Sequence, residues 1–264
     1  MLPHHAGLDL TKLRPMTQVL SAFLFLFCSW GVIGCYGTFF LYFKDILLMQ
    51  HSASDVAWIG SIQQFLAVLV GILTSKWVDY GYMYAMCTVG SILIVLGIMM
   101  NGQGTEYVHI FFSHGVCVGV GTGLIYLPCI TCCSEYHHQK PGVALGLATL
   151  GSSLGSLIFP IMFNKLQPNI GYAWTIRIIG FLVMGLLLLA LLLLRPRSRA
   201  IESRRLFALH VFKDPVYVVF VLGYFLGNMG LYVPPYFLPS FGKHHKFSDA
   251  IFPFTTPLLK TGGI

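Results

Sequence analysis

Residues 172–194 read YAWTIRIIGFLVMGLLLLALLLL, and this stretch decides the fold class. A helix needs about 20 mainly apolar residues to cross the hydrocarbon core of a bilayer, and the only charge here is on Arg177. A strand of a membrane barrel would alternate apolar and polar residues, which residues 181–194 do not. Because a chain in lipid must satisfy its own backbone hydrogen bonds, the stretch is predicted to form a transmembrane helix.

The rest of the chain repeats this pattern. Apolar runs separated by short polar gaps predict seven spans, at about 17–43, 56–74, 83–100, 108–133, 142–163, 172–194 and 216–241. Pro234, Pro235 and Pro239 can kink or end the last span. The predicted fold class is an all-α integral membrane bundle surrounded by the lipid bilayer.

The composition excludes several classes of protein. Of the 264 residues, 56% are hydrophobic and only 9% are charged, whereas a soluble domain carries about 25% charged residues. The net charge is +7, but the cations lie in gaps between apolar runs and not on one solvated face, so no nucleic acid is expected as a partner. The seven cysteines are an odd number and lie mostly in apolar runs, which predicts buried thiols and no disulfide framework.

The distribution of Lys and Arg predicts the orientation. With the N-terminus in the cytoplasm, ten cations fall in cytoplasmic gaps and five in outer gaps, as the positive-inside rule requires. The predicted organisation is a cytoplasmic N-terminus (1–16), a six-helix bundle (17–194), a basic cytoplasmic linker (195–213), a seventh helix (214–241) and an irregular tail (242–264).

Several local motifs resemble one family of transporters. Residues 119–160 read GVGTGLIYLPCITCCSEYHHQKPGVALGLATLGSSLGSLIFP, a glycine-rich helix, a short polar loop and a second helix rich in glycine and serine. Ser29-Trp30-Gly31 lies in the first predicted helix, and Trp174-Thr-Ile-Arg177 lies in the sixth. In their order and spacing, these motifs resemble fungal monocarboxylate-porter-like members of the major facilitator superfamily.

The resemblance implies a fold and a function. It implies the six-helix N-terminal half-bundle of the major facilitator fold followed by helix seven, in an apparently truncated chain. Such proteins are secondary active transporters that work by alternating access between two half-bundles. The expected substrate is a small organic anion or related metabolite, moved with proton coupling across the plasma membrane. The opposing half-bundle would come from a missing C-terminal half or from a homodimer.

Two other functions remain open. The chain is alternatively a truncated membrane protein that does not transport, or a half-transporter that acts only with a partner. A seven-helix receptor is a further alternative, but it would need an outer N-terminus and so a reversed charge bias.

Six residues in the predicted spans are candidates for the substrate pathway: Arg177, His114, Gln63, Gln64, Tyr126 and Asn228. A guanidinium suits a carboxylate, but a long basic side chain near a helix end also extends to the headgroups. A histidine can relay protons because it titrates near neutrality. Histidines and amides in membranes more commonly hydrogen-bond a neighbouring helix, and aromatic residues more commonly pack.

Glycines and one acidic residue give two further expectations. Gly142/Gly146 and Gly151/Gly155 have the spacing that lets helices approach closely. Gly71, Asp79 and Gly81 match part of the superfamily's gating loop between helices two and three, although Tyr80 follows Asp79 where the family has an arginine.

Two motifs resemble an enzyme site and a metal site, but their position and spacing in the chain argue against these functions. Gly151–Gly155 fits the nucleophile-elbow pattern, but Ser153 lies in a predicted membrane helix and not on a strand-to-helix turn. A cluster of metal-ligand types lacks any established zinc spacing: Cys132, Cys133, Glu135, His137 and His138. The sequence therefore predicts no enzyme activity, no catalytic residue, no metal and no cofactor.

Overall fold

The structure is a computed structural model that describes residues 10–104, 106–136, 141–195 and 213–231. Every regular element in these ranges is a helix, which confirms the predicted fold class. The elements are α1 (Leu10–Gly34), α2 (Tyr36–Tyr42), η1 (Phe43–Leu47), α3 (Ala53–Leu73), α4 (Ser75–Asp79), α5 (Met83–Asn101), α6 (Tyr107–Ile110), η2 (Phe111–Cys117), α7 (Val118–Tyr136), α8 (Pro141–Leu193) and α9 (Pro215–Leu231).

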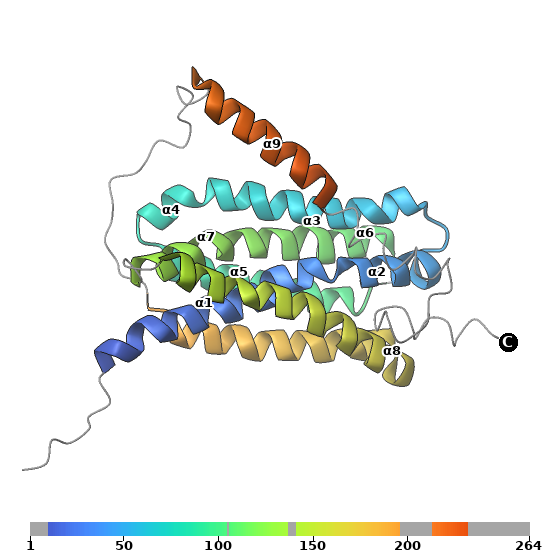
Figure 1. Ribbon diagram of the computed structural model, residues 1–264. Helices are drawn as coiled ribbons and strands as arrows, with labels where there is room; N and C mark the ends of the chain where they lie inside the picture. Colours follow the sequence, from blue (N-terminus) through green and yellow to red (C-terminus); the bar gives the residue numbers. More distant parts are fainter. Residues whose placement is uncertain (1–9, 105, 137–140, 196–212, 232–264) are drawn as a thin grey trace, which may run out of the picture.

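Five helical segments in the described part of the chain are long and apolar enough to cross a membrane. One of them, α8, has 53 residues, whereas about 20 suffice for one crossing. Gly171 inside it has φ 78°, a backbone angle that favours glycine, and the helix reverses there. Figure 1 shows the two legs of α8 side by side, so α8 supplies two crossings. Pro234, Pro235 and Pro239 lie outside the described residues.

Close packing of backbones holds α7 between α3 and α5. A Cβ atom added at Gly119 would lie 2.7 Å from the carbonyl oxygen of Gln63 on α3. One added at Gly121 would lie 2.7 Å from the carbonyl oxygen of Gly90 on α5. Only glycine permits such an approach on both sides of the helix, so α7 packs closely against both neighbours.

α1 packs against both legs of α8. Gly151 and Gly155 on the first leg contact the backbone of Phe23 and Phe27 on α1, as their spacing predicted. The same expectation is wrong for Gly142 and Gly146, because an added Cβ at either position would find no atom of the described residues within 4 Å. The spacing is identical, but the first turns of α8 lie away from α1.

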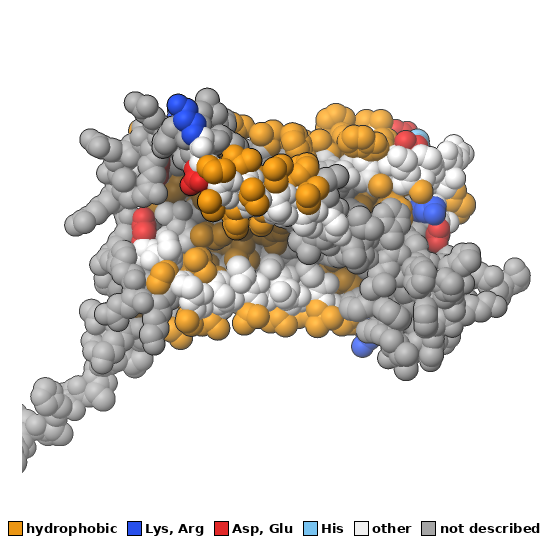
Figure 2. Space-filling view, turned by 45° about the horizontal axis from the view of Figure 1, so that its top comes forward, with side chains coloured by type: hydrophobic (Ala, Val, Ile, Leu, Met, Phe, Trp, Pro, Cys, Tyr) orange, Lys and Arg blue, Asp and Glu red, His pale blue; other side chains and the backbone are white. Residues whose placement is uncertain are grey.

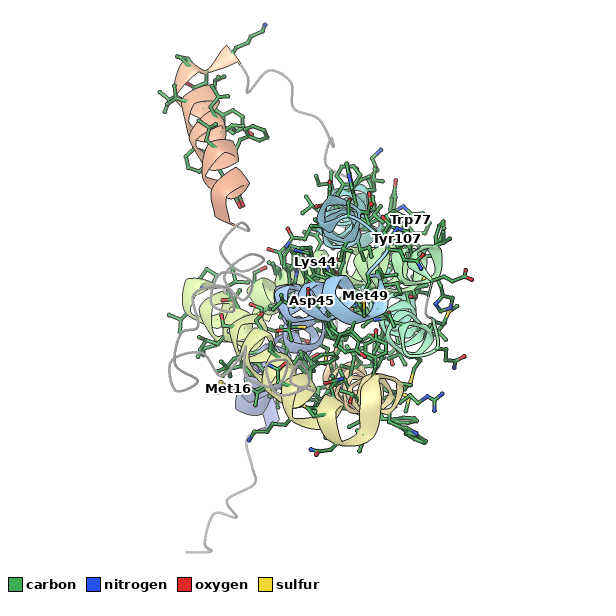
Figure 3. The ribbon with its side chains drawn as sticks, turned by 90° about the vertical axis from the view of Figure 1, so that its right-hand side faces the viewer. Met16, Lys44, Asp45, Met49, Trp77 and Tyr107 are labelled. Carbon is green, nitrogen blue, oxygen red and sulfur yellow. The ribbon has the colours of Figure 1, made fainter. Side chains whose placement is uncertain are left out.

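The outer surface of the bundle suits lipid. Figure 2 shows hydrophobic side chains along the flanks and charged side chains near the two ends of the helices. Large apolar side chains such as Phe65, Ile92 and Leu188 are more than half exposed. Exposed apolar flanks between charged ends are expected of an integral membrane protein, whose flanks face hydrocarbon. Helix α9 stands apart from the bundle in Figures 1 and 3.

Candidate functional site

An aromatic pair joins α1 to α7. The ring centroids of Trp30 and Tyr126 lie 5.2 Å apart with the planes tilted by 59°. Both side chains are partly buried. The indole nitrogen of Trp30 has no hydrogen-bond partner among the described residues. The pair therefore packs α1 against α7 through two aromatic faces and leaves one buried donor unpaired.

The two adjacent glutamines of α3 lie in different environments. Gln63 is fully buried, and the backbone of Gly119 packs against it. Neither atom of its amide has a hydrogen-bond partner within the described ranges. Gln64 is only partly buried. Successive residues of a helix do not share a face, so Gln63 points into the bundle and Gln64 toward its edge.

Thr122 is a further buried polar residue near this region that the sequence prediction left out. It lies on α7 one turn before Tyr126 and is fully buried. Its hydroxyl group has no hydrogen-bond partner in the described part of the chain. Nothing in the sequence separates Thr122 from the other small polar residues of the spans, so only packing identifies it.

His114 lies inside the bundle. It belongs to η2, a π-helical segment, and is 1% exposed. Its ring contacts those of Tyr36 and Phe39 on α2, with centroids 5.8 and 5.1 Å away. Its Nδ1 atom lies 3.3 Å from Nδ2 of Asn101 at the end of α5. The structure therefore places His114 in an internal aromatic pocket and pairs it with an amide.

Arg177 and Asn228 each have a partner on their own helix. The guanidinium of Arg177 sits over the ring of Trp174, 5.0 Å from the centroid, and Trp174 is 58% exposed. This is a cation–π contact at the outer surface of the bundle. Asn228 donates to the carbonyl of Tyr224 within its own helix, at 2.8 Å. The six predicted pathway residues therefore do not form one cluster.

The three residues of the predicted gating loop lie along α3 and just beyond it. Gly71 packs near the backbone of Gly123, with an added Cβ 3.7 Å from its carbonyl oxygen. Asp79 is the last residue of α4 and is partly buried. Gly81 has φ 87°, so it occupies the left-handed region that L-residues avoid and ends the turn before α5.

A buried glutamine of α1 forms hydrogen bonds with the end of α8. The sequence prediction missed this residue. Gln18 on α1 donates to the carbonyl of Leu193 at 2.9 Å and accepts from the backbone N–H of Arg195 at 3.0 Å. Tyr136 at the end of α7 donates to the carbonyl of Arg195 at 2.9 Å. These bonds satisfy backbone groups that lack an intrahelical partner at the end of a helix. They also hold Arg195, the first residue of the predicted linker, in place.

A hollow lies at one end of the bundle. It has a volume of about 430 Å³ and is bordered by residues 46–51 together with Glu106 and Tyr107. The rings of His51 and Tyr107 stack there, with centroids 4.9 Å apart. Figure 3 looks onto this end, where Lys44, Asp45 and Met49 are labelled. None of the six predicted pathway residues borders this hollow.

Comparison with known proteins gives a consistent result. The sequence model described as the Major Facilitator Superfamily matches residues 19–263. The chain is 36% identical over 243 residues to a protein of Emericella nidulans named an MFS-type transporter, covering 92% of this chain and 55% of that protein. It is 36% identical over 207 residues to an MFS-type transporter of a Phoma species, covering 78% and 73%.

A third relative carries the name of a substrate. It is an aspyridones efflux protein of Emericella nidulans, 32% identical over 227 residues, with 86% of this chain and 46% of that protein covered. The chain thus spans about half the length of two of these three relatives.

Proposed function

The chain belongs to the Major Facilitator Superfamily, and we propose that it forms a wall of the substrate pathway in a secondary active transporter that exports a small organic anion or a related metabolite. The proteins of this family that it matches are transporters and not enzymes. The observation that carries the proposal is the Trp30–Tyr126 pair, whose partly buried rings and unpaired indole N–H lie where α1 meets α7. Gln64 adds a partly buried amide on the neighbouring α3.

The name of one relative supports the direction and the class of substrate. The aspyridones efflux protein is named for the export of an organic product, and it is 32% identical to this chain over 227 residues. We therefore favour export of a metabolite over uptake of a nutrient. Coupling to a proton gradient is part of the proposal and follows the family resemblance alone.

The pathway needs an opposing wall. In alternating access, the substrate site lies between two repeats that rock about it. We propose that a second six-helix bundle faces the Trp30–Tyr126 pair, supplied by a C-terminal half or by a second copy. His114 and Gln63 lie inside the bundle, where they support its packing. Arg177, which sits against Trp174, anchors the outer surface near the headgroups.

The export function has a direct test. Cells that express the protein should retain less of a supplied metabolite such as an aspyridone than cells that carry the empty vector. Collapse of the proton gradient should remove the difference, because a secondary transporter takes its energy from the gradient. Equal retention in both kinds of cell, with the protein present in the plasma membrane, would contradict the proposal.

Asp79 is proposed to hold one state of the gate. It ends α4, from where a carboxylate can interact with a neighbouring basic group or helix end when the gate is closed. Asp79→Asn should therefore leave the amount of protein in the membrane unchanged and lower the rate of transport about tenfold, equal to about 1.4 kcal/mol. Asp45→Asn, at the other end of the bundle, is the matched control. If the Asp79→Asn variant transports at the normal rate, Asp79 has no role in gating.

The orientation gives a second prediction. We propose that the N-terminus and the basic linker 195–213 face the cytoplasm, because most Lys and Arg of the gaps then lie inside. A thiol or glycosylation tag beside Arg199 should resist membrane-impermeant reagents in intact cells, and a tag beside Gln50 should react. Labelling at Arg199 from outside would reverse the assignment.

A further inference from the structure

A turn with an aromatic surface joins the second predicted span to the third. This aromatic turn, residues 74–84, contains α4 and the start of α5 and lies at one end of the bundle (Figure 1). Val78 and Met83 are buried and belong to the hydrophobic core of the bundle. The backbone N–H of Tyr82 donates to the carbonyl of Trp77 at 3.0 Å. The turn is therefore held both by the core and by its own backbone.

The exposed side of the aromatic turn carries large rings. Four aromatic side chains are between 48 and 61% exposed: Trp77, Tyr80, Tyr82 and Tyr84. The centroids of Trp77 and Tyr82 lie 6.5 Å apart. Lys76, the neighbour of Trp77, is also exposed. Figure 3 looks along the bundle and shows Trp77 at its rim. Apolar rings and a cation therefore share one outward surface.

The position of the turn along the helices indicates what these rings meet. Ile72 and Leu73, at the end of α3, are exposed, and so are Val89 and Ile92 on α5. Both helices next to the turn thus present apolar side chains to hydrocarbon, and the rings come directly after them. Tryptophan and tyrosine are enriched at the boundary between hydrocarbon and headgroups, because each has an apolar body and one polar group.

We propose that the aromatic turn binds the membrane surface, with its four rings in the layer between the acyl chains and the headgroups of phospholipids. The rings pack against the first methylene groups of the acyl chains, and the indole N–H and the phenol hydroxyls donate to ester and phosphate oxygens. The ammonium of Lys76 lies at the phosphates, which attract basic side chains. The turn also carries Asp79, so this contact sets the depth of its carboxylate in the membrane.

The experiment measures tryptophan fluorescence of the 264-residue chain in phosphatidylcholine vesicles. Trp30, Trp58 and Trp174 are replaced by phenylalanine, which leaves Trp77 as the only tryptophan. The quencher is a nitroxide attached either to the lipid headgroup or near the end of the acyl chain. The headgroup nitroxide should quench Trp77 about twofold more strongly than the deep one, because the ring lies at the boundary. Iodide in the aqueous phase should quench it weakly.

The matched control is a tryptophan in the middle of the same span. Phe65 lies in the middle of α3 and is 58% exposed, close to the exposure of Trp77. Phe65→Trp combined with Trp77→Phe should show the reverse order, with stronger quenching by the deep nitroxide. The same order at both positions would overturn the proposal. So would strong quenching of Trp77 by iodide alone, or protection of Trp77 from all three quenchers, which would mean that protein covers the ring.

A triple variant tests whether the tyrosines share the contact. Tyr80→Ser, Tyr82→Ser and Tyr84→Ser together remove three exposed rings and leave the buried Val78 and Met83 in place. Quenching of Trp77 by the headgroup nitroxide should then fall to about half, and quenching by iodide should rise. Unchanged quenching in a variant with the wild-type melting temperature would contradict a shared contact. If the variant does not fold, the comparison of Trp77 with Phe65→Trp decides.

Discussion

Replacing both Gly151 and Gly155 with alanine should destabilise the bundle so strongly that little folded protein reaches the membrane. An added Cβ at Gly151 would overlap the carbonyl oxygen of Phe23, and one at Gly155 would overlap that of Phe27. Both obstacles are backbone atoms of α1, which cannot move aside as a flexible side chain can. Overpacking in a tight core costs about 1–3 kcal/mol per site, and two sites on one interface should give most of that sum.

The same helix supplies the matched control. Gly142 and Gly146 have the same spacing, and within the described part of the chain an added Cβ at either would meet nothing closer than 4 Å. Alanine at these positions should be neutral or slightly stabilising, because alanine is favoured over glycine in a helix by about 1 kcal/mol. The measurement is the yield of monodisperse protein and its melting temperature in detergent. Equal losses in the two double variants would show that backbone contact between α1 and α8 is not what matters.

Trp30→Ala and Tyr126→Ala should each abolish most transport while the bundle still folds. Both side chains are partly buried where α1 meets α7, and their rings contact each other. Removal of either ring loses an aromatic contact of about 0.5–1.5 kcal/mol, in addition to the free energy from its buried apolar area. With the apolar contact included, the initial rate of export should fall about tenfold or more.

The control for this prediction is another aromatic residue. Trp174 is 58% exposed and lies under the guanidinium of Arg177 on the outer surface. Trp174→Ala should leave the rate of export near that of the wild type. Trp30→Phe should restore part of the rate lost in Trp30→Ala, because it keeps an aromatic face and lacks the indole donor. If both alanine variants transport at the full rate, the substrate pathway does not lie where α1 meets α7.

The sequence predicts the helical class well because lipid imposes it. Runs such as residues 181–194 leave no alternative to a helix once the surrounding solvent is hydrocarbon. The ends of the helices are less predictable. The first span was expected from residue 17, but α1 begins at Leu10, because a helix continues past the apolar stretch that enters the membrane. The turn between the fifth and sixth spans is confined to Gly171, since the helix continues through polar residues before it.

The candidate site was harder to predict because it depends on which faces meet. Gly142/Gly146 and Gly151/Gly155 are indistinguishable by spacing, yet an α1 backbone lies against only the second pair. His114 was recognised as unusual, but its partner Asn101 comes from the end of another span. The buried role of Gln18 depends on the end of α8, 175 residues away in the sequence. Contacts at this separation follow from the packing of helices, and a single sequence does not encode them in any local pattern.

The most direct test of the central claim, that this bundle forms one wall of a transport pathway, is gradient-driven transport in sealed vesicles. The chain would be joined to the C-terminal half of the aspyridones efflux protein, so that an opposing wall is present, and supplied with labelled aspyridones. The account predicts movement that depends on an imposed proton gradient and is lost in the Trp30→Ala and Tyr126→Ala variants. Movement equal to that in empty vesicles, from a joined protein that is folded and inserted, would contradict it.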